Sequence, residues 1–184
     1  MASGAASPGS GPVRTLRDWL DRLGATERLS VIKPGVDLVH EVAAIANRLD
    51  GRTATFFPNP SGHHGSVVSG LVSSRAWMAE AFGVGQDELI AHFQKATANP
   101  LKWREVESGP AQEVVHREDI DLLKLMPIPT LNEHDSGPYI SAGLTISRDP
   151  ETGEQNVAIL RCQISGPDRI GVLILPRHTD YFYR

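Results

Sequence analysis

The sequence predicts a mixed α/β (α+β) fold, and two patterns in it carry that prediction. Over the first hundred of the 184 residues, amphipathic helical stretches alternate with short apolar stretches typical of strands. After Gly137 the helical periodicity stops, and three apolar runs follow, joined by the turn-forming segments "DPETGE" and "GPDR". Alternating helices and strands indicate a compact α/β layer, whereas strands joined by short turns indicate hairpins. We therefore expect an N-terminal α/β lobe followed by an all-β region.

The lobe is expected to begin with a helix, a strand and a second helix. "RTLRDWLDRLGA" predicts the first helix, stopped by Gly24, because four apolar side chains recur at helical spacing: Leu16, Trp19, Leu20 and Leu23. "RLSVIKPG" predicts a short strand closed by Pro-Gly. "DLVHEVAAIANRLDG" predicts the second helix, with Gly51 as its C-cap and an apolar face made by Leu38, Val42, Ile45, Ala46 and Leu49.

The rest of the chain divides into three stretches. Strands are expected in "TATFFPNPSG" and "GSVVSGLVS", then helices in "SRAWMAEAFG" and "GQDELIAHFQKATAN", the last ending before Pro100. Residues 102–139 are rich in proline and acidic residues, and we expect one strand, "AQEVVH", one helical turn, "DIDLL", and a stiff "MPIPT" segment within them. Three strands follow in "YISAGLTISRD", "EQNVAILRCQIS" and "RIGVLILP".

Composition excludes several classes of protein. The formal net charge of −4 does not mark a general nucleic-acid binder. No apolar run approaches the roughly 20 residues that span a bilayer. Residues 1–13 begin with small, nearly uncharged residues and lack a secretory signal, so we expect a disordered tail. The single Cys162 lies in an apolar strand, which favours an inert core thiol in a reducing, cytoplasmic environment.

Other polar clusters are weaker candidates for a site. His63 and His64 are adjacent in a glycine-rich loop without acidic or cysteine partners, as in an exposed turn. "HEVAA" is not the HExxH zinc signature, because Ala44 stands where the second histidine would be. Glu133, His134 and Asp135 fit a solvated loop, although a place at the border of an active site stays open.

Over nearly everything from Thr15 to Arg184 the chain resembles the UbiD family of decarboxylases. The resemblance is carried by "LRDWLDRLGATERLSVIKPGVDLVHEVAAIANRL", by "TATFFPNPSGHHGSVVSGLVSSRAWMAEAFGV" and by the long run "LMPIPTLNEHDSGPYISAGLTISRDPETGEQNVAILRCQISGPDRIGVLILPRH". It implies an N-terminal α/β lobe over residues 14–105. Residues 106–184 would form the first strands of a split β-barrel that binds prenylated flavin mononucleotide. The implied reaction removes or adds a carboxyl group on a small aromatic or α,β-unsaturated acid.

The resemblance also assigns roles to residues near the end of the chain. The family's Asn, four residues, Arg pattern matches Asn156, Val157, Ala158, Ile159, Leu160 and Arg161, and its later polar pair matches Arg177 and His178. These eight residues are implied to line the cofactor. Asn156 and His178 would hold Mn²⁺ or Mg²⁺, the carbonyl of Val157 would serve K⁺, and Arg161 would bind the substrate carboxylate as the catalytic residue.

The residue types suit these roles, but the spacing of Asn156 and Arg161 along a strand raises one difficulty. Amide, imidazole and phosphate donors suit manganese or magnesium, and the planar fork of arginine suits a carboxylate. Asn156 and Arg161 lie roughly 17 Å apart along an extended strand, about the length of the flavin nucleotide. A five-residue offset places them on opposite faces of a regular strand, so a bulge or strong twist is expected.

Each residue taken alone has a simpler explanation. Asn156 fits a turn residue, His178 an exposed loop residue, and Arg161 an edge residue that reaches solvent. Their order and spacing together favour one site.

The family's remaining catalytic groups lie further along the chain, so we expect an N-terminal piece. A flavin prenyltransferase would supply the cofactor, and the completed protein would be a homo-oligomer. Two alternatives stay open. One is a non-catalytic fragment or a binding subunit that needs a partner to complete the site. The other, a flavin reductase-like protein, is disfavoured because no nicotinamide site is indicated.

Overall fold

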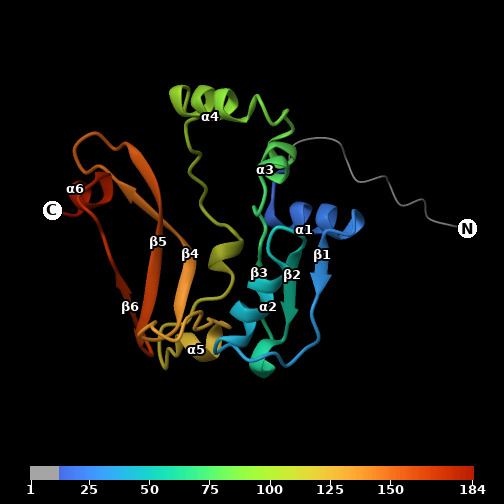
Figure 1. Ribbon diagram of the computed structural model, residues 1–184. Helices are drawn as coiled ribbons and strands as arrows, with labels where there is room; N and C mark the ends of the chain where they lie inside the picture. Colours follow the sequence, from blue (N-terminus) through green and yellow to red (C-terminus); the bar gives the residue numbers. More distant parts are fainter. Residues whose placement is uncertain (1–12) are drawn as a thin grey trace, which may run out of the picture. The chain divides into compact units, whose positions relative to one another are not determined.

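The computed structural model describes residues 13–184, so the predicted tail lies almost entirely outside the described residues. The helices and strands form a mixed α/β fold with two three-stranded sheets, in the orders β1-β2-β3 and β4-β5-β6 (Figure 1). The predicted fold class is thus confirmed. Val13, the last residue assigned to the tail, donates its N–H to the carbonyl of Ala81.

The first sheet contains the three strands expected in the lobe. They are β1 (Leu29–Val31), β2 (Ala54–Pro58) and β3 (Ser66–Ser69). β1 and β2 are parallel, with Leu29 opposite Ala54. Parallel neighbours need a crossover connection, and α2 (Glu41–Leu49) lies in that connection. The predicted alternation of helix and strand therefore produces the parallel pair.

The helices of the lobe follow their capping signals. α1 (Leu16–Ala25) begins with a capping box in which Thr15 and Asp18 bond each other's backbone N–H groups. α3 (Arg75–Phe82) begins at the Ser74 cap and ends at Gly83, whose φ of +71° is readily adopted by glycine. α4 (Leu89–Ala98) ends before Pro100. α2 begins later than predicted, because His40 has a φ of +66°.

A tryptophan-rich core fixes α1 and α3 against the first sheet. Trp19, Leu23, Ala54 and Trp77 are its buried members. The Trp19 indole N–H donates to the Leu71 carbonyl at 2.8 Å, which satisfies a polar group that burial would otherwise penalise. The Arg28 guanidinium lies 5.7 and 5.4 Å from the Trp19 and Trp77 ring centroids, within the range of cation–π attraction.

The second sheet is antiparallel and contains β4 (Tyr139–Arg148), β5 (Gln155–Gly166) and β6 (Arg169–Val172). Asp149 organises the β4–β5 turn, since its Oδ1 accepts the N–H groups of Glu151 and Thr152. The bond from Glu151 is the main cause of the lowered pKa of the Asp149 carboxyl. β6 ends at Val172, four residues before the predicted end at Pro176. Proline has no N–H to donate to a strand ladder, so Pro176 is poorly suited to be the last strand residue.

One expectation about the connecting segments needs correction. Residues 111–116 do not form a strand; the short 3-10 helix η2 (Pro110–Gln112) is followed by irregular chain. Val114 and Val115 are exposed there, because strand-forming side chains without a neighbouring strand make no ladder. The predicted helical turn is present as α5 (Leu122–Leu125), capped by Asp121. A last helix, α6 (His178–Tyr183), was not predicted.

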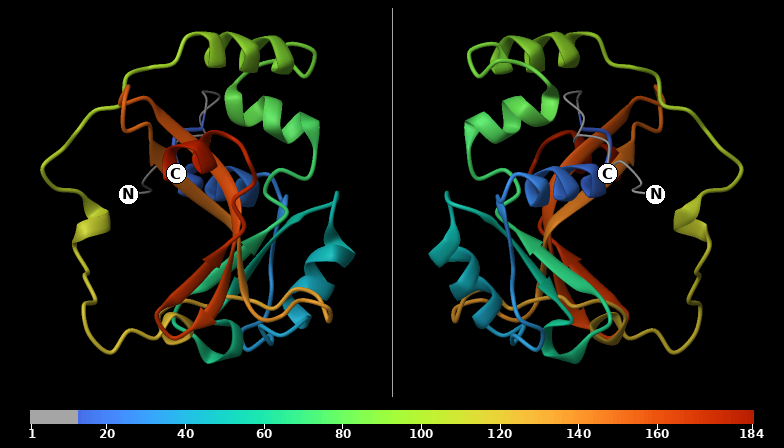
Figure 2. Two further views of the ribbon diagram at one scale, coloured as in Figure 1. Left: turned by 90° about the vertical axis from the view of Figure 1, so that its left-hand side faces the viewer. Right: turned by 90° about the vertical axis from the view of Figure 1, so that its right-hand side faces the viewer.

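The described chain folds into two compact units. The first comprises the segment that ends at Ile32, with Ala46–Phe57 and Val68–Val115. The second comprises Lys33–Ile45, Pro58–Val67 and His116–Arg184. Within the second unit, α6 contacts β4 and β5, as the views of the hairpin show (Figure 2). The predicted domain boundary at residue 105 remains a prediction.

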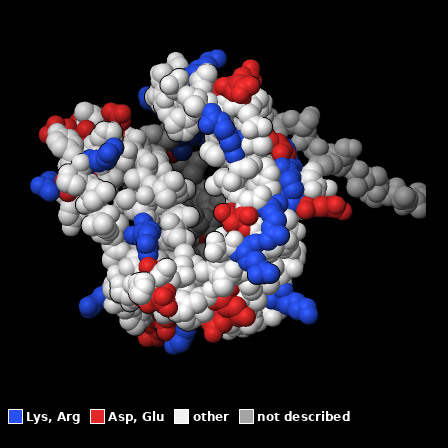
Figure 3. Space-filling model, viewed as in Figure 1, with Lys and Arg blue, Asp and Glu red and all other residues white. Residues whose placement is uncertain are grey.

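The distribution of charge and the length of the helices can be described for residues 13–184. Lys or Arg and Asp or Glu side chains are mixed on the face drawn in Figure 3. No helix between residues 13 and 184 has the length and apolar character needed to cross a membrane.

Candidate active site

β5 carries most of the predicted site, and its two faces carry different groups. Exposure alternates regularly from Gln155 to Cys162, which places Asn156 and Arg161 on opposite faces. The expected bulge is not in this part of β5. It lies in β4, where Ser141 and Ala142 together oppose Arg161 between the pairs Gly143–Leu160 and Ile140–Cys162.

Arg161 is held by two neighbours from the second unit. Its Nη2 donates to Asp135 Oδ1 at 2.7 Å. Its guanidinium carbon lies 4.2 Å from the centroid of the Tyr139 ring, the geometry of a cation–π contact. The Asp135 side chain is 15% exposed, whereas the Arg161 side chain is 56% exposed. The Asp135 carboxylate is therefore mostly buried, and the Arg161 guanidinium stays accessible.

The Asp135 side chain is itself held by a tight turn. Asp135 Oδ2 accepts the N–H of Asn132 at 3.2 Å, and the N–H of Asp135 donates to the carbonyl of Asn132 at 3.0 Å. Asp135 is therefore more than a member of the solvated loop that the sequence favoured, whereas Glu133 and His134 are exposed as expected. The contact with Arg161 spans 26 residues, so no local pattern in the sequence signals it.

Arg161 borders an open cavity of about 540 Å³ within the second unit. Asp135, Ser136 and Gln163 contribute polar groups to its lining, and Tyr139, Val172 and Leu173 contribute apolar surface. A charged fork beside an aromatic ring and aliphatic side chains is suited to a small acid with an apolar body.

The opposite face of β5 carries Asn156, one of the two predicted metal ligands, whereas the exposed His178 ring stacks with Phe182 at 6.4 Å between ring centroids. Asn156 Nδ2 donates to Thr179 Oγ1 at 3.1 Å, and His178 directly precedes Thr179 at the start of α6. Ser147 is opposite Asn156 in the ladder, and its Oγ is buried without a hydrogen-bond partner. An unpaired buried hydroxyl is uncommon, and a phosphate oxygen or a hydrated cation would satisfy it. Asn156, Ser147 and Thr179 are thus polar groups of the kind that the implied phosphate and metal end of a flavin nucleotide would need, and their role remains a prediction.

The metal site that the family resemblance implies would be incomplete within the described residues. No group of three or more His, Cys, Asp or Glu side chains with metal-binding geometry occurs between residues 13 and 184. Asn156 and His178 can supply an amide oxygen and an imidazole nitrogen, and manganese or magnesium would need further oxygen ligands.

Among the described residues, β5 has no strand partner on one of its two edges over residues 155–161, the part that carries the predicted site. β6 pairs with β5 only from Cys162 to Gly166, while β4 pairs along its other side. In the part of the chain that the structure describes, no strand pairs with the remaining edge from Gln155 to Arg161. Backbone groups along that edge therefore make no ladder hydrogen bonds with another described strand.

An apolar surface adjoins Arg161 on its face of the sheet. Leu144 pairs with Ile159 and Ile146 with Val157, and all four side chains are more than half exposed. Single exposed apolar residues are ordinary, whereas these four side chains adjoin one another and form an exposed apolar patch.

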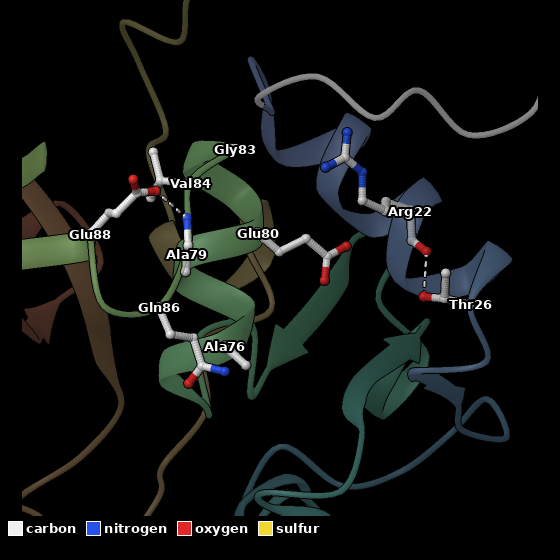
Figure 4. Close-up of a pocket in the computed structure, with 10 residues that line it drawn as sticks. Arg22, Thr26, Ala76, Ala79, Glu80, Gly83, Val84, Gln86 and Glu88 are labelled. Carbon is white, nitrogen blue, oxygen red and sulfur yellow. Dashed lines mark hydrogen bonds between the residues drawn. The ribbon is translucent and has the colours of Figure 1, made fainter.

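A second cavity, of about 580 Å³, lies within the first unit between α1, α3 and the loop after Gly83 (Figure 4). Its acidic side chains are already engaged. Arg28 donates two hydrogen bonds to Glu80, and these bonds are the main cause of the lowered pKa of that carboxyl. Glu88 accepts the N–H of Gly85. These contacts give both carboxylates a structural role.

The fold and site can now be compared with known proteins. Residues 20–97 match the 3-octaprenyl-4-hydroxybenzoate carboxy-lyase N-terminal domain, and residues 104–184 match the 3-octaprenyl-4-hydroxybenzoate carboxy-lyase Rift-related domain. Together these matches cover most of the sequence. The chain belongs to the UbiD family.

Relatives of this UbiD-family chain include named decarboxylases and flavin complexes. Anhydromevalonate phosphate decarboxylase of Methanosarcina mazei is 34% identical over 92% of this chain and 38% of the relative. The UbiD-class enzyme HmfF of Pelotomaculum thermopropionicum, in complex with FMN, is 41% identical, with a TM-score of 0.87 over 91% of this chain and 38% of that enzyme. An evolved dimeric form of HmfF, in complex with prenylated FMN, has the same identity and TM-score over 91% and 40%. The chain thus spans roughly two-fifths of the length of these proteins.

Proposed function

We propose that this UbiD-family chain contributes the N-terminal lobe and the arginine side of the site to a prenylated-FMN-dependent carboxy-lyase. The substrate would be a small aromatic or α,β-unsaturated carboxylic acid. The observation that carries the proposal is Arg161, accessible at an open cavity beside the Tyr139 ring. The decarboxylase names and flavin complexes among the relatives support the same reaction class.

In this proposal Arg161 binds and orients the substrate carboxylate. Two parallel hydrogen bonds from a guanidinium fix a carboxylate in position and orientation. Tyr139, Val172 and Leu173 would pack against the apolar body of the acid and exclude water. When bound, the prenylated flavin supplies the electron sink for loss of carbon dioxide. The protein's share is therefore to hold the substrate where that chemistry takes place.

The cofactor would be held along β5 and at the start of α6. The supporting observations are the open edge of β5 over residues 155–161 and the polar group of Asn156, Ser147 and Thr179. Asn156 donates a hydrogen bond from Nδ2 to Thr179, so the Oδ1 atom of Asn156 remains as a ligand for Mn²⁺ or Mg²⁺. His178 would be a second ligand. Arg177 would approach the phosphate, and K⁺ at the Val157 carbonyl remains a prediction.

The proposal extends to partners and location. A flavin prenyltransferase would supply the cofactor, and the whole protein would form a homo-oligomer. We also propose a cytoplasmic location, on the ground that the single Cys162 is a partly buried free thiol.

Flavin retention tests the proposal directly. The chain would be co-expressed with a flavin prenyltransferase, purified, and analysed by absorbance and by the mass of the released ligand. We expect modified flavin at a near-equimolar ratio, with loss of flavin on His178→Ala and retention on the exposed control Arg169→Ala. A folded protein without flavin would contradict autonomous cofactor binding and favour the alternative of a binding subunit that needs a partner. The exposed apolar pairs on β4 and β5 give that alternative its basis.

A further inference from the structure

The guanidinium of Arg161 has one occupied edge and one open edge. Nη2 is engaged by Asp135, and the face of the group lies over the Tyr139 ring. Among residues 13–184, no group accepts a hydrogen bond from Nε or Nη1 of Arg161, and more than half of the side chain is exposed. A guanidinium offers five N–H donors in a fixed plane, so donors remain for a second anion.

The neighbours of Arg161 are themselves fixed. Asp135 is bonded to the backbone of Asn132 through its second carboxylate oxygen, and only 15% of its side chain is exposed. Tyr139 lies in β4, opposite Gln163 of β5. Arginine loses rotamer freedom when it binds a ligand, and a group that is already ordered loses less. The pair therefore preorganises a long and otherwise mobile side chain.

We propose that Asp135 and Tyr139 are positioning residues that hold Arg161 so that its open edge receives an aromatic carboxylate in the adjoining cavity. The identity of the ligand class rests on the proposed function, whereas the positioning rests on the geometry alone. The Tyr139 ring and the side chains of Val172 and Leu173 give the cavity the apolar surface that an aromatic body requires.

A rival role for Asp135 makes the opposite prediction. A carboxylate 2.7 Å from the guanidinium partly neutralises it and repels a second anion. If this effect dominated, removal of the charge would tighten anion binding, and salt would weaken the difference because charges near solvent are screened. If positioning dominates, removal of the hydrogen-bond acceptor loosens binding at any salt concentration.

Titration with benzoate separates the two roles. The 184-residue chain would be titrated at low and high salt, with the Arg161 side-chain NMR signal and calorimetry as readouts and benzamide as the uncharged control. Asp135→Ala is expected to weaken benzoate binding about threefold to tenfold, the cost of ordering one side chain. Asp135→Asn should stay close to the wild type, because its amide oxygen still accepts from Nη2.

Matched variants keep the outcome clear. Tyr139→Phe retains the ring and should bind like the wild type, whereas Tyr139→Leu should weaken binding. Asp168→Ala removes an exposed carboxylate from the β5–β6 turn and should change nothing. Circular dichroism would confirm that each variant is folded. Tighter binding by both Asp135 variants, unchanged binding by Asp135→Ala, or no benzoate response in the wild type would overturn the proposal. No flavin is required, so failure of the decarboxylase proposal would be seen separately, in the flavin-retention experiment.

Discussion

Gly143→Ala tests how tightly the bulge opposite Arg161 is packed. A Cβ at Gly143 would lie 2.8 Å from the Leu160 carbonyl oxygen and 3.0 Å from Cys162 Sγ. The oxygen belongs to the backbone of β5, so the contact cannot be relieved by a rotamer change alone. The strands must separate by several tenths of an ångström, and overpacking of this kind costs about 1–3 kcal/mol. Lower entropy of the unfolded chain offsets about 0.4–1 kcal/mol of that cost.

The expected net loss is therefore about 1–2 kcal/mol, or roughly 3–6 °C in Tm for a chain of this size. Urea and thermal unfolding of the purified chain would measure it. Gly24→Ala is the control, because Gly24 lies in α1 with no atom within 4 Å of the added Cβ. It should raise the free energy of unfolding by up to about 1 kcal/mol through helix propensity. A Gly143→Ala variant at least as stable as the wild type would refute the packing argument at Gly143.

Three further predictions concern the site and the ion pair of the lobe. In the complete enzyme, Arg161→Ala should lower decarboxylation by about two orders of magnitude or more while largely sparing bound flavin; loss of the flavin would contradict the role as carboxylate binder. His178→Ala should lower manganese and flavin content together, as measured by metal analysis and absorbance, and an unchanged manganese content would count against the ligand role. Glu80→Gln should flatten the acid side of the stability–pH curve. The pKa of Glu80 is lowered by Arg28, so the stabilisation is present above the ordinary glutamate pKa and is lost as the pH falls below about 4. An equal acid slope in the wild type and the variant would exclude that contribution.

Local signals in the sequence determine the helices of the lobe, and these were predictable. Thr15 with Asp18, Ser74 and Gly83 act through bonds to the neighbouring backbone, so their effect is visible in a few residues. The strand predicted at residues 111–116 is absent because a strand depends on contacts with a distant segment. Two adjacent valines favour extended chain, but a strand also needs a partner, and none pairs with them in the described structure.

The site was predictable only in part, because its contacts join distant segments. Asn156, Arg161 and His178 were predicted from their spacing and the family resemblance, and their roles remain predictions. α6 was missed because a six-residue helix has little periodicity, and Thr179 gains its role only by meeting Asn156 across 23 residues. Asp135 likewise resembles any acidic loop residue until the fold brings it to Arg161. Polar residues whose role depends on tertiary contacts leave no local pattern.

The opposite orientation of Asn156 and Arg161 is compatible with a single ligand for a reason the sequence could not supply. A flavin nucleotide that lay flat on one face of β5 could contact only one of these two side chains. Between them, however, β5 pairs with β4 on one side, and no strand of residues 13–184 pairs with its other edge. A ligand that follows this edge would have the polar group of Asn156 at one end and Arg161 at the other, with backbone groups of residues 155–161 between them. The bulge predicted in β5 is then unnecessary, because the open edge gives access to both faces.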